Sequence, residues 1–408
     1  MHLVLLNQYF PPDAAPTGLM VERVAEELTM QGHEVTIVCA RGGYAKITKA
    51  ISSKEEEKKY QVLRIGATGF GRETFLGKLV DYAGFYLGVA WKLAFLSPKP
   101  ERFIALTTPP FLSVIARLIS KIRGGDHASW VMDLYPDVLV AHGIIRSGGW
   151  NEKLLKCFTR IGFGGSRCAG VWSLGPDMEP RVARYLKDDT PSGWIALWGK
   201  EVEEDDLDEK ANQVRNERGW GSNDLVVMYS GNLGLGHLFD EILEVAKSPN
   251  ASVGKKEVRF TFHGNGKRRV EVERFQQEFP DAPVELHGYE PKERLNSHLR
   301  SADVHLVSLN PAWDGTMVPS KLQGIFAVGR PVILIGSKDS SIGQWVTESG
   351  GGWIVPPGDS EGLASAIDAA GHEEERVKRG RAAMKFSQSA FSQDTNSRRY
   401  AEAFARGT

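Results

Sequence analysis

Residues 2–39 read HLVLLNQYFPPDAAPTGLMVERVAEELTMQGHEVTIVC and contain a strand, a helix and a second strand. The apolar run at 2–7 predicts a buried strand, and Met20, Val24 and Leu28 recur at the spacing of one helix face. Gly32 stands where a helix C-cap belongs, and residues 34–39 resume as a strand. This βαβ unit predicts a parallel sheet covered by helices.

The same alternation extends over the rest of the chain. Further strand candidates lie at 103–108, 128–134 and 169–175, and a second series lies at 225–231, 257–264, 284–289, 302–310, 330–337 and 351–359. The 408 residues are enough for two domains of about 150–200 residues each. We therefore predict an α/β protein of two Rossmann-like, doubly wound parallel-sheet domains that face a central cleft, with ligands at the carboxyl ends of the strands.

The predicted domain boundary follows a change in composition. Between Lys200 and Lys210 lie seven acidic residues, which is typical of a solvated linker or an exposed helix. We assign residues 1–190 to the N-terminal domain, 191–222 to a linker and 223–385 to the C-terminal domain.

Composition excludes several classes of protein. The 50 Lys and Arg residues nearly balance the 51 Asp and Glu residues, which argues against a protein that coats nucleic acid. The three cysteines have no C-x-x-C spacing, so they favour a reducing compartment over a disulfide framework or a zinc site. The longest uncharged apolar stretch, 82–91, is about half a membrane span, and residues 2–7 are interpreted as a strand and not a signal peptide. We expect a cytoplasmic protein.

Residues 74–102 combine aromatic and aliphatic side chains with Lys78, Lys92, Lys99 and Arg102. A helix of this composition either packs in the core or lies on an anionic bilayer surface. The following helix adds Arg117, Lys121 and Arg123, which favours peripheral contact with a membrane.

Two glycine-rich loops follow predicted strands in the second half, Ser230–Gly236 and His263–Gly266. A helix-like run follows the first loop, so its backbone N–H groups are candidates to cradle a phosphate at a positive helix end, and the second loop repeats the pattern, although ordinary tight turns also use glycine. Neither loop has the G-x-x-x-x-G-K-[ST] pattern, which argues against a P-loop kinase or ATPase.

Lys321 closes the segment Asp314-Gly-Thr-Met-Val-Pro-Ser-Lys321 and precedes an apolar, helix-like run. Ser320 and Lys321 would then lie on the first turn of a helix, where a cation opposes the helix dipole. A phosphate would offset that charge through a charge-assisted contact, and the alternative is a solvated lysine.

The first half offers two further candidates. Residues 7–18 form a βα loop longer than such a connection needs, in which Thr17 is a candidate N-cap. Asp133 closes the strand at 128–134, where a carboxylate either orients or deprotonates a hydroxyl or caps the next helix. No Ser-His-Asp order or H-E-x-x-H motif points to a hydrolytic triad or to zinc catalysis.

Six segments together resemble the family 4 glycosyltransferases of GT-B fold. They are NQYFPPDAAPTG, GHEVTIVCARGGY, VMDLYPD, YSGNLGLGH, ADVHLVSLNP and VPSKLQGIFAVGRPVI, and the resemblance runs from residue 3 to about residue 368. The most similar branch makes colanic acid, O-antigen and other bacterial surface polysaccharides.

This resemblance implies transfer of a sugar from a nucleotide donor, usually UDP-linked, to an acceptor hydroxyl with retention of configuration and without a bound metal or other cofactor. It implies an N-terminal acceptor domain, a C-terminal nucleotide domain, and a final helix at 386–405 that brings residues 386–408 back onto the first domain. The donor-binding residues would be Thr17, Gly18, Gly231, Asn232, Gly234, His263, Gly264, His287, Gly288, Tyr289, Thr316, Ser320 and Lys321. Thr17, Gly18 and Lys321 would face the diphosphate, and the two His-Gly pairs the nucleoside.

The sequence departs from the family at the E-x7-E pair, whose second glutamate holds the ribose. Thr316 and Gly324 stand at these two positions. Other groups would therefore have to recognise the ribose and the phosphate.

We expect a retaining glycosyltransferase that acts on a lipid-linked glycan acceptor, with Lys321 and Asp133 as the catalytic residues. The alternatives are a sugar-nucleotide epimerase and a catalytically silent nucleotide-sugar-binding subunit. Incubation with a UDP-sugar alone would distinguish the epimerase, because only that enzyme forms a new UDP-sugar without an acceptor.

Overall fold

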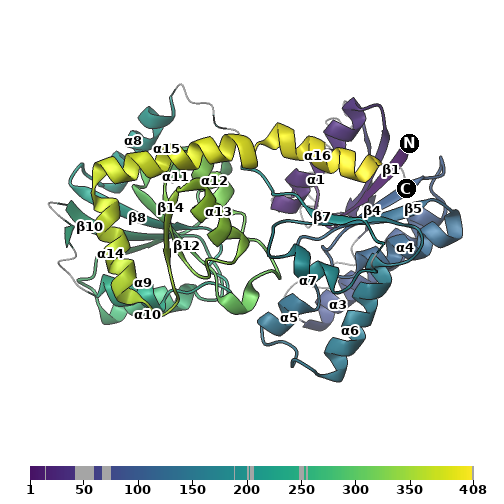
Figure 1. The fold of residues 1–408 in the computed structure, drawn as a ribbon, viewed down its shortest axis with the longest axis horizontal. Coiled ribbons are helices and arrows are strands. Elements are labelled where there is room, and N and C mark those ends of the chain that lie inside the picture. Colours follow the sequence, from purple (N-terminus) through teal and green to yellow (C-terminus); the bar gives the residue numbers. More distant parts are fainter. Residues whose placement is uncertain are drawn as a thin grey trace. The chain divides into compact units, whose positions relative to one another are not determined.

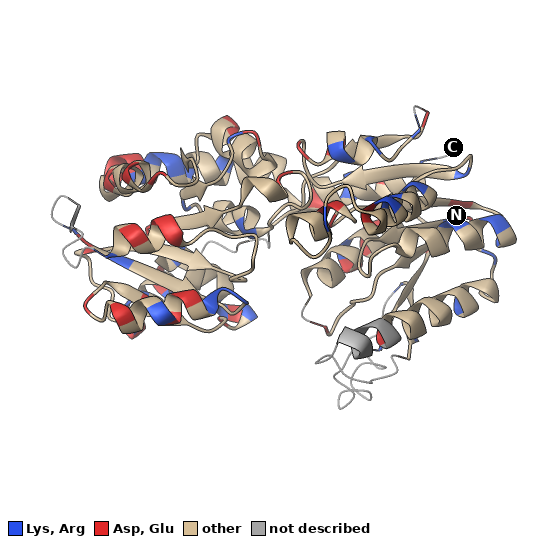
Figure 2. Ribbon diagram, turned by 90° about the horizontal axis from the view of Figure 1, so that it is seen from below, with Lys and Arg blue, Asp and Glu red and all other residues tan. Residues whose placement is uncertain are grey.

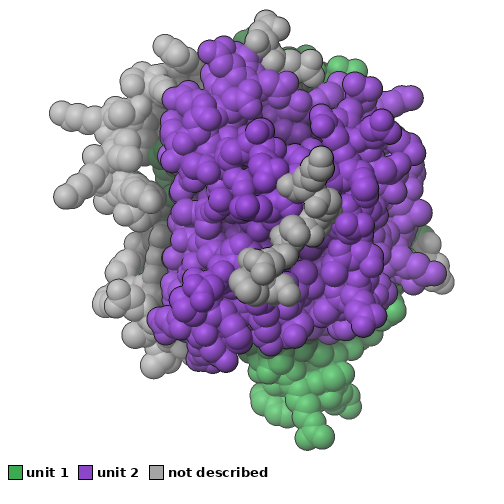
Figure 3. All heavy atoms as spheres, turned by 90° about the vertical axis from the view of Figure 1, so that its left-hand side faces the viewer, with its two compact units in different colours: residues 1–196, 315–317, 394–408 green, residues 197–314, 318–393 purple. Residues whose placement is uncertain are grey.

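The structure is a computed structural model that describes residues 1–13, 15–41, 59–66, 75–187, 189–199, 202, 206–247, 252–253 and 256–406. These residues form two compact units (Figures 1 and 3). Unit 1 contains residues 1–196, 315–317 and 394–408, and unit 2 contains residues 197–314 and 318–393. The chain therefore has the two α/β domains that the alternation of strands and helices predicts.

Unit 1 is built on a parallel sheet whose strands lie in the order β3-β2-β1-β4-β5-β6-β7. The strands are β1 His2–Leu6, β2 Glu34–Ala40, β3 Gln61–Ile65, β4 Arg102–Leu106, β5 Asp126–Trp130, β6 Cys168–Ser173 and β7 Ser192–Trp194. The helices of this part of the chain are α1 Pro16–Met30, α3 Phe75–Ala94, α4 Leu112–Arg123, α5 Asp137–Ala141, α6 Trp150–Phe163 and α7 Glu179–Ala183. One apolar core lies between the sheet and helices α3 and α4.

Unit 2 has a second sheet in the order β11-β10-β8-β12-β13-β14, with β9 antiparallel to β10. Its strands are β8 Asp224–Ser230, β9 Ser252–Val253, β10 Lys256–His263, β11 Val284–His287, β12 Val304–Ser308, β13 Val332–Ile335 and β14 Gly352–Val355. Its helices are α8 Leu207–Arg218, α9 Asp240–Ala246, α10 Arg269–Glu278, α11 Leu295–Ser301, α12 Lys321–Ala327, α13 Ser341–Ser349, α14 Ser360–Gly371 and α15 Glu373–Ala390, with short 3₁₀ turns at Lys292–Arg294 and Pro311–Trp313.

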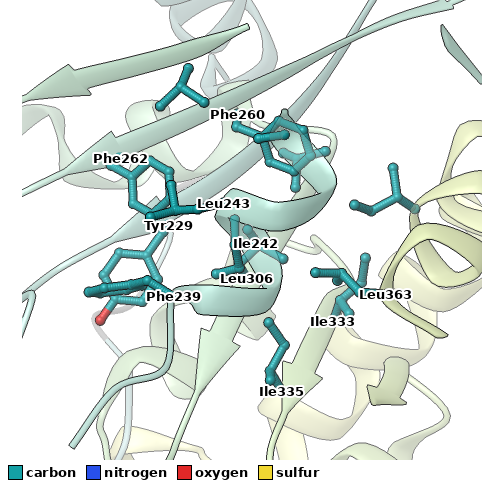
Figure 4. Packing of buried hydrophobic residues seen from close by; sticks show 14 of the residues in the cluster. Tyr229, Phe239, Ile242, Leu243, Phe260, Phe262, Leu306, Ile333, Ile335 and Leu363 are labelled. Atoms are coloured by element: carbon teal, nitrogen blue, oxygen red, sulfur yellow. The ribbon is translucent and has the colours of Figure 1, made fainter. Parts of the chain in front are cut away.

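The sheet of unit 2 has an apolar core on one face, and on the other face Val226 and Met228 pack in a second cluster with Val214 of helix α8. Phe260, Phe262 and Leu306 pack against helix α9, and Ile333 and Ile335 pack toward helix α14 (Figure 4). The charged residues lie mainly on helices and loops and leave the strands largely uncharged (Figure 2). This distribution is expected for a parallel sheet that helices cover on both faces.

The strands predicted from apolar runs are present, and most are shorter than predicted, although β2 is one residue longer and β8 and β10 keep their predicted lengths. The strand predicted at 128–134 ends at Trp130, so Asp133 lies in the loop that follows it. Strands β3 and β7 were not predicted, because β3 is half-exposed and β7 has only three residues. Both lie at edges of the sheet, where the apolar signal is weakest.

The predicted linker at 191–222 is not a separate segment in the described residues. Strand β7 belongs to the sheet of unit 1, and helix α8 buries Leu207, Ala211 and Val214 in unit 2. The acidic residues 201 and 203–205, and residues 42–44 of the resembling GHEVTIVCARGGY segment, lie outside the described residues.

The C-terminal segment forms two helices, and not the single one expected at 386–405. Helix α15 ends at Ala390, and α16 Gln393–Ala405 follows it, with the boundary between the units at residue 394. Within unit 1, the Arg102 guanidinium donates to the carbonyls of Phe404 and Arg406 at 2.6 Å and pairs with Asp126. The return of the terminal residues to the first domain is thus present, from residue 394 onward.

None of the helices in the described residues has the length and apolarity needed to cross a membrane.

Candidate active site

Lys321 is the first residue of helix α12, and Ser320 precedes it at the N-cap, as predicted. Its Nζ donates a hydrogen bond to the Tyr229 hydroxyl, lies 3.6 Å from the centre of that ring and 3.4 Å from the Asn232 carbonyl oxygen. Burial lowers the pKa of the Lys321 ammonium well below its usual range. Among the described residues, no carboxylate forms an ion pair with Lys321. The site therefore has a desolvated cation whose charge is not balanced by a described acid.

The loop after strand β8 lies directly against Lys321. Gly231 has a φ of 131°, and a Cβ at this position would stand 2.7 Å from Lys321 Cε. The N–H groups of Gly231 and Leu233 donate to the carbonyls of His263 and Asn265, at 2.8 and 2.9 Å. The N–H groups of Asn232 and Gly234 make no hydrogen bond within the described residues. Only part of the loop is thus available to an anion.

The helix after this loop begins later than expected. Helix α9 starts at Asp240 and has Asp240 and Glu241 in its first turn. These acids already complement the helix dipole, so the expectation that this helix end follows the glycine loop directly and attracts a phosphate is wrong.

The second glycine loop packs backbone to backbone on the first. Gly264 has a φ of 136°, and a Cβ there would stand only 2.0 Å from the Gly231 carbonyl oxygen. Its N–H donates to the His287 carbonyl at 3.1 Å. The close approach of two chain segments explains this glycine without a ligand, and it brings the predicted residues Gly231, His263, Gly264 and His287 together at the carboxyl ends of β8, β10 and β11.

The predicted nucleoside residues differ in exposure. His263 is 1% exposed, and its ring stacks on that of His287 at a centroid distance of 4.7 Å. Tyr289 is 62% exposed, and its hydroxyl donates to the Asn265 carbonyl at 3.1 Å. A Cβ added at Gly288 would meet no atom within 4 Å, so the backbone there is not crowded. His287, Gly288 and Tyr289 therefore offer more surface to a ligand than the buried ring of His263.

Two polar residues that contact the first glycine loop or its end, His237 and Arg268, were not predicted as site residues from the sequence. His237 Nδ1 lies 2.6 Å from the Ser308 carbonyl oxygen, and burial together with the Lys321 charge lowers its pKa to about 3. Arg268 donates to the His237 carbonyl and holds Glu271 with its Nε, at 2.8 and 2.9 Å from the two carboxylate oxygens. In the sequence, His237 could have been found as the last residue of the GLGH segment, and Arg268 as part of the basic run after the second glycine loop.

Thr316 belongs to unit 1, whereas Lys321 and its contacts belong to unit 2. The Thr316 carbonyl oxygen accepts a hydrogen bond from the Leu134 N–H at 2.7 Å, and the residue is 1% exposed. Gly315 donates its N–H to the Asp177 carboxylate at 2.9 Å. Within the described residues of unit 1, the buried Thr316 thus connects the 315–317 segment to the loop after β5.

The N-cap role predicted for Thr17 is wrong. Helix α1 begins at Pro16 with Ala15 as its N-cap, so Thr17 lies within the first turn. Asn7 Nδ2 lies 3.5 Å from the Thr17 hydroxyl oxygen, and a Cβ on Gly18 would stand 3.1 Å from Phe10 Cα. Gly18 thus lets the long loop pack closely on the helix start.

Asp133 has a polar backbone environment and a desolvated side chain. Its N–H donates to the Thr107 hydroxyl at 3.1 Å, and its carboxylate makes no hydrogen bond to a described residue. Helix α5 has Pro136 as its N-cap, so the alternative that Asp133 caps this helix does not hold. Burial raises the pKa of the Asp133 carboxyl from 3.8 to about 6, which suits a group that exchanges a proton near neutrality.

The two doubly wound parallel sheets define a protein of the GT-B class. The crystal structure of Anabaena HepE in complex with UDP and glucose has the same fold, with a TM-score of 0.69 at 14% identity over 98% of each chain. Residues 225–371 match the family described as Glycosyl transferases group 1, and the chain is a glycosyltransferase with a group 1 domain.

Curated relatives agree with this classification. The chain is 23% identical to the putative colanic acid biosynthesis glycosyl transferase WcaI of Escherichia coli (strain K12) over 379 residues, which cover 90% of this chain and 91% of that relative. It is 26% identical to the probable glycosyltransferase WbjE of Pseudomonas aeruginosa over 277 residues, or 68% of each chain.

Proposed function

We propose that the chain transfers a sugar from a UDP-sugar to a lipid-linked glycan acceptor, with retention of anomeric configuration, in the synthesis of a bacterial surface polysaccharide. The names of WcaI and WbjE support the polysaccharide and the transfer reaction, and the UDP and glucose bound to HepE support the donor. We assign the donor to unit 2 and the acceptor to unit 1.

Lys321 is the observation that carries the donor assignment. Lys321 is half-buried, has no described carboxylate partner, and lies 3.4 Å from the Asn232 carbonyl oxygen, in the loop whose Asn232 and Gly234 N–H groups make no hydrogen bond within the described residues. A diphosphate at this position would offset the buried charge and accept hydrogen bonds from those amides.

In the proposed reaction the bond between the anomeric carbon and the diphosphate oxygen breaks, and a bond to the acceptor oxygen forms. Negative charge develops on the departing UDP, and Lys321 would stabilise it together with the two amides. Because these groups supply the positive potential, we propose that the transfer step needs no bound metal. Asp133 would position the acceptor hydroxyl or take its proton.

A surface on unit 1 suits a lipid-linked acceptor. Leu87, Trp91 and Phe95 are 72%, 71% and 68% exposed along α3 and the turn after it, and Ile122 of α4 is 76% exposed. The rings of Trp91 and Phe95 stand 4.8 Å apart. We call these four residues, with the exposed Lys92 and Lys121, the apolar–basic surface.

Three arginines predicted for this surface have structural contacts, and Arg102 is only 1% exposed and pairs with Asp126. Arg123 donates to the Leu96 carbonyl at 2.5 Å, and Arg117 donates to the Ile161 carbonyl. Thr74 and the side chains of 75–80, Lys78 included, lie outside the described residues. We propose that the apolar–basic surface rests on the anionic inner face of the cytoplasmic membrane, where the acceptor lipid is found.

Lys321→Met tests the donor site. We expect the Kd for UDP to rise at least about tenfold, because a charge-assisted contact to phosphate is lost. Burial lowers the pKa of Lys321 and a bound diphosphate opposes that shift, so UDP binding should take up protons at pH values between the pKa of the free and the bound state, and affinity should fall as the pH rises through that range. Calorimetry in two buffers with different ionisation enthalpies measures this uptake.

Lys378→Ala is the matched control, since Lys378 of α15 is 76% exposed and only 3.4 Å from Glu375. It should bind UDP like the wild type. Unchanged affinity or unchanged proton uptake in Lys321→Met would reject the assigned role of Lys321.

A further inference from the structure

Three side chains from separate segments of unit 2 converge beside the glycine loops. His263 ends strand β10, His298 lies on helix α11, and Glu290 follows strand β11. The two histidines are 1% and 0% exposed, and the Glu290 side chain is 12% exposed. Among the described residues, these three form a group whose donor atoms all lie within 4.8 Å of one another.

The two imidazoles have no hydrogen-bond partner for either ring nitrogen within the described residues. A neutral imidazole has one N–H donor and one lone pair, and burying both without partners is unfavourable. Neutral imidazole is the form that binds a metal ion.

The geometry is close to that of a metal site. The Nδ1 atoms of His263 and His298 are each 3.9 Å from the same oxygen, Glu290 Oε1. A tetrahedral Zn²⁺ with bonds of about 2.0–2.2 Å to nitrogen and oxygen places neighbouring ligand atoms roughly 3.3–3.5 Å apart. Each nitrogen–oxygen distance would have to shorten by about half an ångström, and the distance between the two nitrogens, which is within 4.8 Å, by at most about 1.5 Å, to complete three ligands and leave the fourth position to water.

The surroundings orient the carboxylate. Arg218 donates to Glu290 Oε1 and approaches His287 Nδ1 at 3.0 Å, and the other ring nitrogen of His287 lies 3.1 Å from Glu285. The Arg218 charge repels a cation, so the affinity should be moderate. Two imidazoles favour Zn²⁺ or Co²⁺ over Mg²⁺ and Ca²⁺, which prefer oxygen ligands.

We propose that His263, His298 and Glu290 bind one Zn²⁺ ion with a structural role. The ion would link the end of β10, the segment after β11 and helix α11, and so hold in place the loop that begins at Gly264. The site is distinct from the Lys321 group and takes no part in the transfer step. It does not depend on the proposed sugar transfer.

Metal binding by the full chain tests the site directly. After chelation and removal of the chelator, the wild-type protein should bind one equivalent of Zn²⁺ in calorimetry, and its melting temperature should rise. Co²⁺ should give visible absorption bands of tetrahedral coordination. These readouts need no donor, no acceptor and no activity.

His298→Leu should lose the bound equivalent, the Co²⁺ bands and the thermal shift. His127→Leu is the matched control, because His127 of unit 1 is also a buried histidine whose ring nitrogens have no hydrogen bond within the described residues, and it should keep all three. If His298→Leu does not fold, Glu290→Gln takes its place. No zinc uptake by the wild type, or equal uptake by wild type and variant, would overturn the proposal.

Discussion

Asp133 of unit 1 is half-buried, and its carboxylate makes no hydrogen bond to a described residue that would stabilise its charge. A carboxylate in this environment lowers the stability of the folded state, and its raised pKa suits proton exchange. Both properties are common at functional sites. The apolar run before Asp133 predicts its place near a strand end, but burial of the carboxyl depends on segments far away, such as Thr107 and the 315–317 segment.

The pH dependence of stability follows from the raised pKa of Asp133. Between the unfolded value of 3.8 and the folded value of about 6, the folded state binds a proton that the unfolded state releases. This contribution therefore makes the protein less stable as the pH rises through that window. Asp133→Asn should be more stable than the wild type at pH 7, by an amount on the order of 3 kcal/mol, with no gain below pH 4.

Urea unfolding of Asp133→Asn and wild type at pH 7 and pH 4 measures this difference. An equal effect at both pH values would contradict the raised pKa. If Asp133 also positions the acceptor, the variant should lose activity although it gains stability.

At the scale of elements, helix α12 contains the glycine that the family resemblance leaves unexplained. Gly324 is the fourth residue of this helix and has no positive φ. A Cβ there would meet only Leu299 Cδ1 at 3.5 Å, an ordinary contact. The backbone and its packing do not require glycine here.

Gly324→Ala should therefore stabilise the protein by up to about 1 kcal/mol, because alanine is the better helix former. Gly329→Ala is a control on the same connection. Its φ of 68° and a Cβ position 2.6 Å from Met384 Cε predict destabilisation. The midpoints of urea unfolding measure the change in stability of both variants. A loss of stability in Gly324→Ala would show that the glycine has a structural role.

Element boundaries were predictable where a run of apolar residues is buried on both faces, as in β8, β10 and β12. The prediction failed at β3 and β7, whose residues are partly exposed, and for the terminal helix, which is divided between α15 and α16. Hydrophobic periodicity in a sequence reflects burial, so elements at the edge of a sheet or at the boundary between the units give only a weak pattern.

At the scale of the whole molecule, binding to a bilayer is the property to test. Trp91→Ser with Phe95→Ser removes the two aromatic rings of the apolar–basic surface. We expect about tenfold less binding to vesicles that contain phosphatidylglycerol, and weak binding of the wild type to neutral vesicles or at high salt. Co-sedimentation with vesicles measures the bound fraction.

Met30→Ser is the control variant, because Met30 of helix α1 is 63% exposed and lies outside the apolar–basic surface. It should bind like the wild type. Equal binding of the double variant and the wild type would exclude this surface as the contact.

The sequence by itself determined that this protein has two parallel α/β domains, the positions of most strands, and the placement of Ser320 and Lys321 at a helix start. These properties depend on local periodicity and on turn residues, which neighbouring positions in the chain encode. Only the tertiary structure decided that Lys321 contacts Tyr229, that Thr316 belongs with Asp133 in unit 1, and that His263, Glu290 and His298 converge. Desolvation and contacts between distant segments arise when the chain packs, and no local pattern of residues records them.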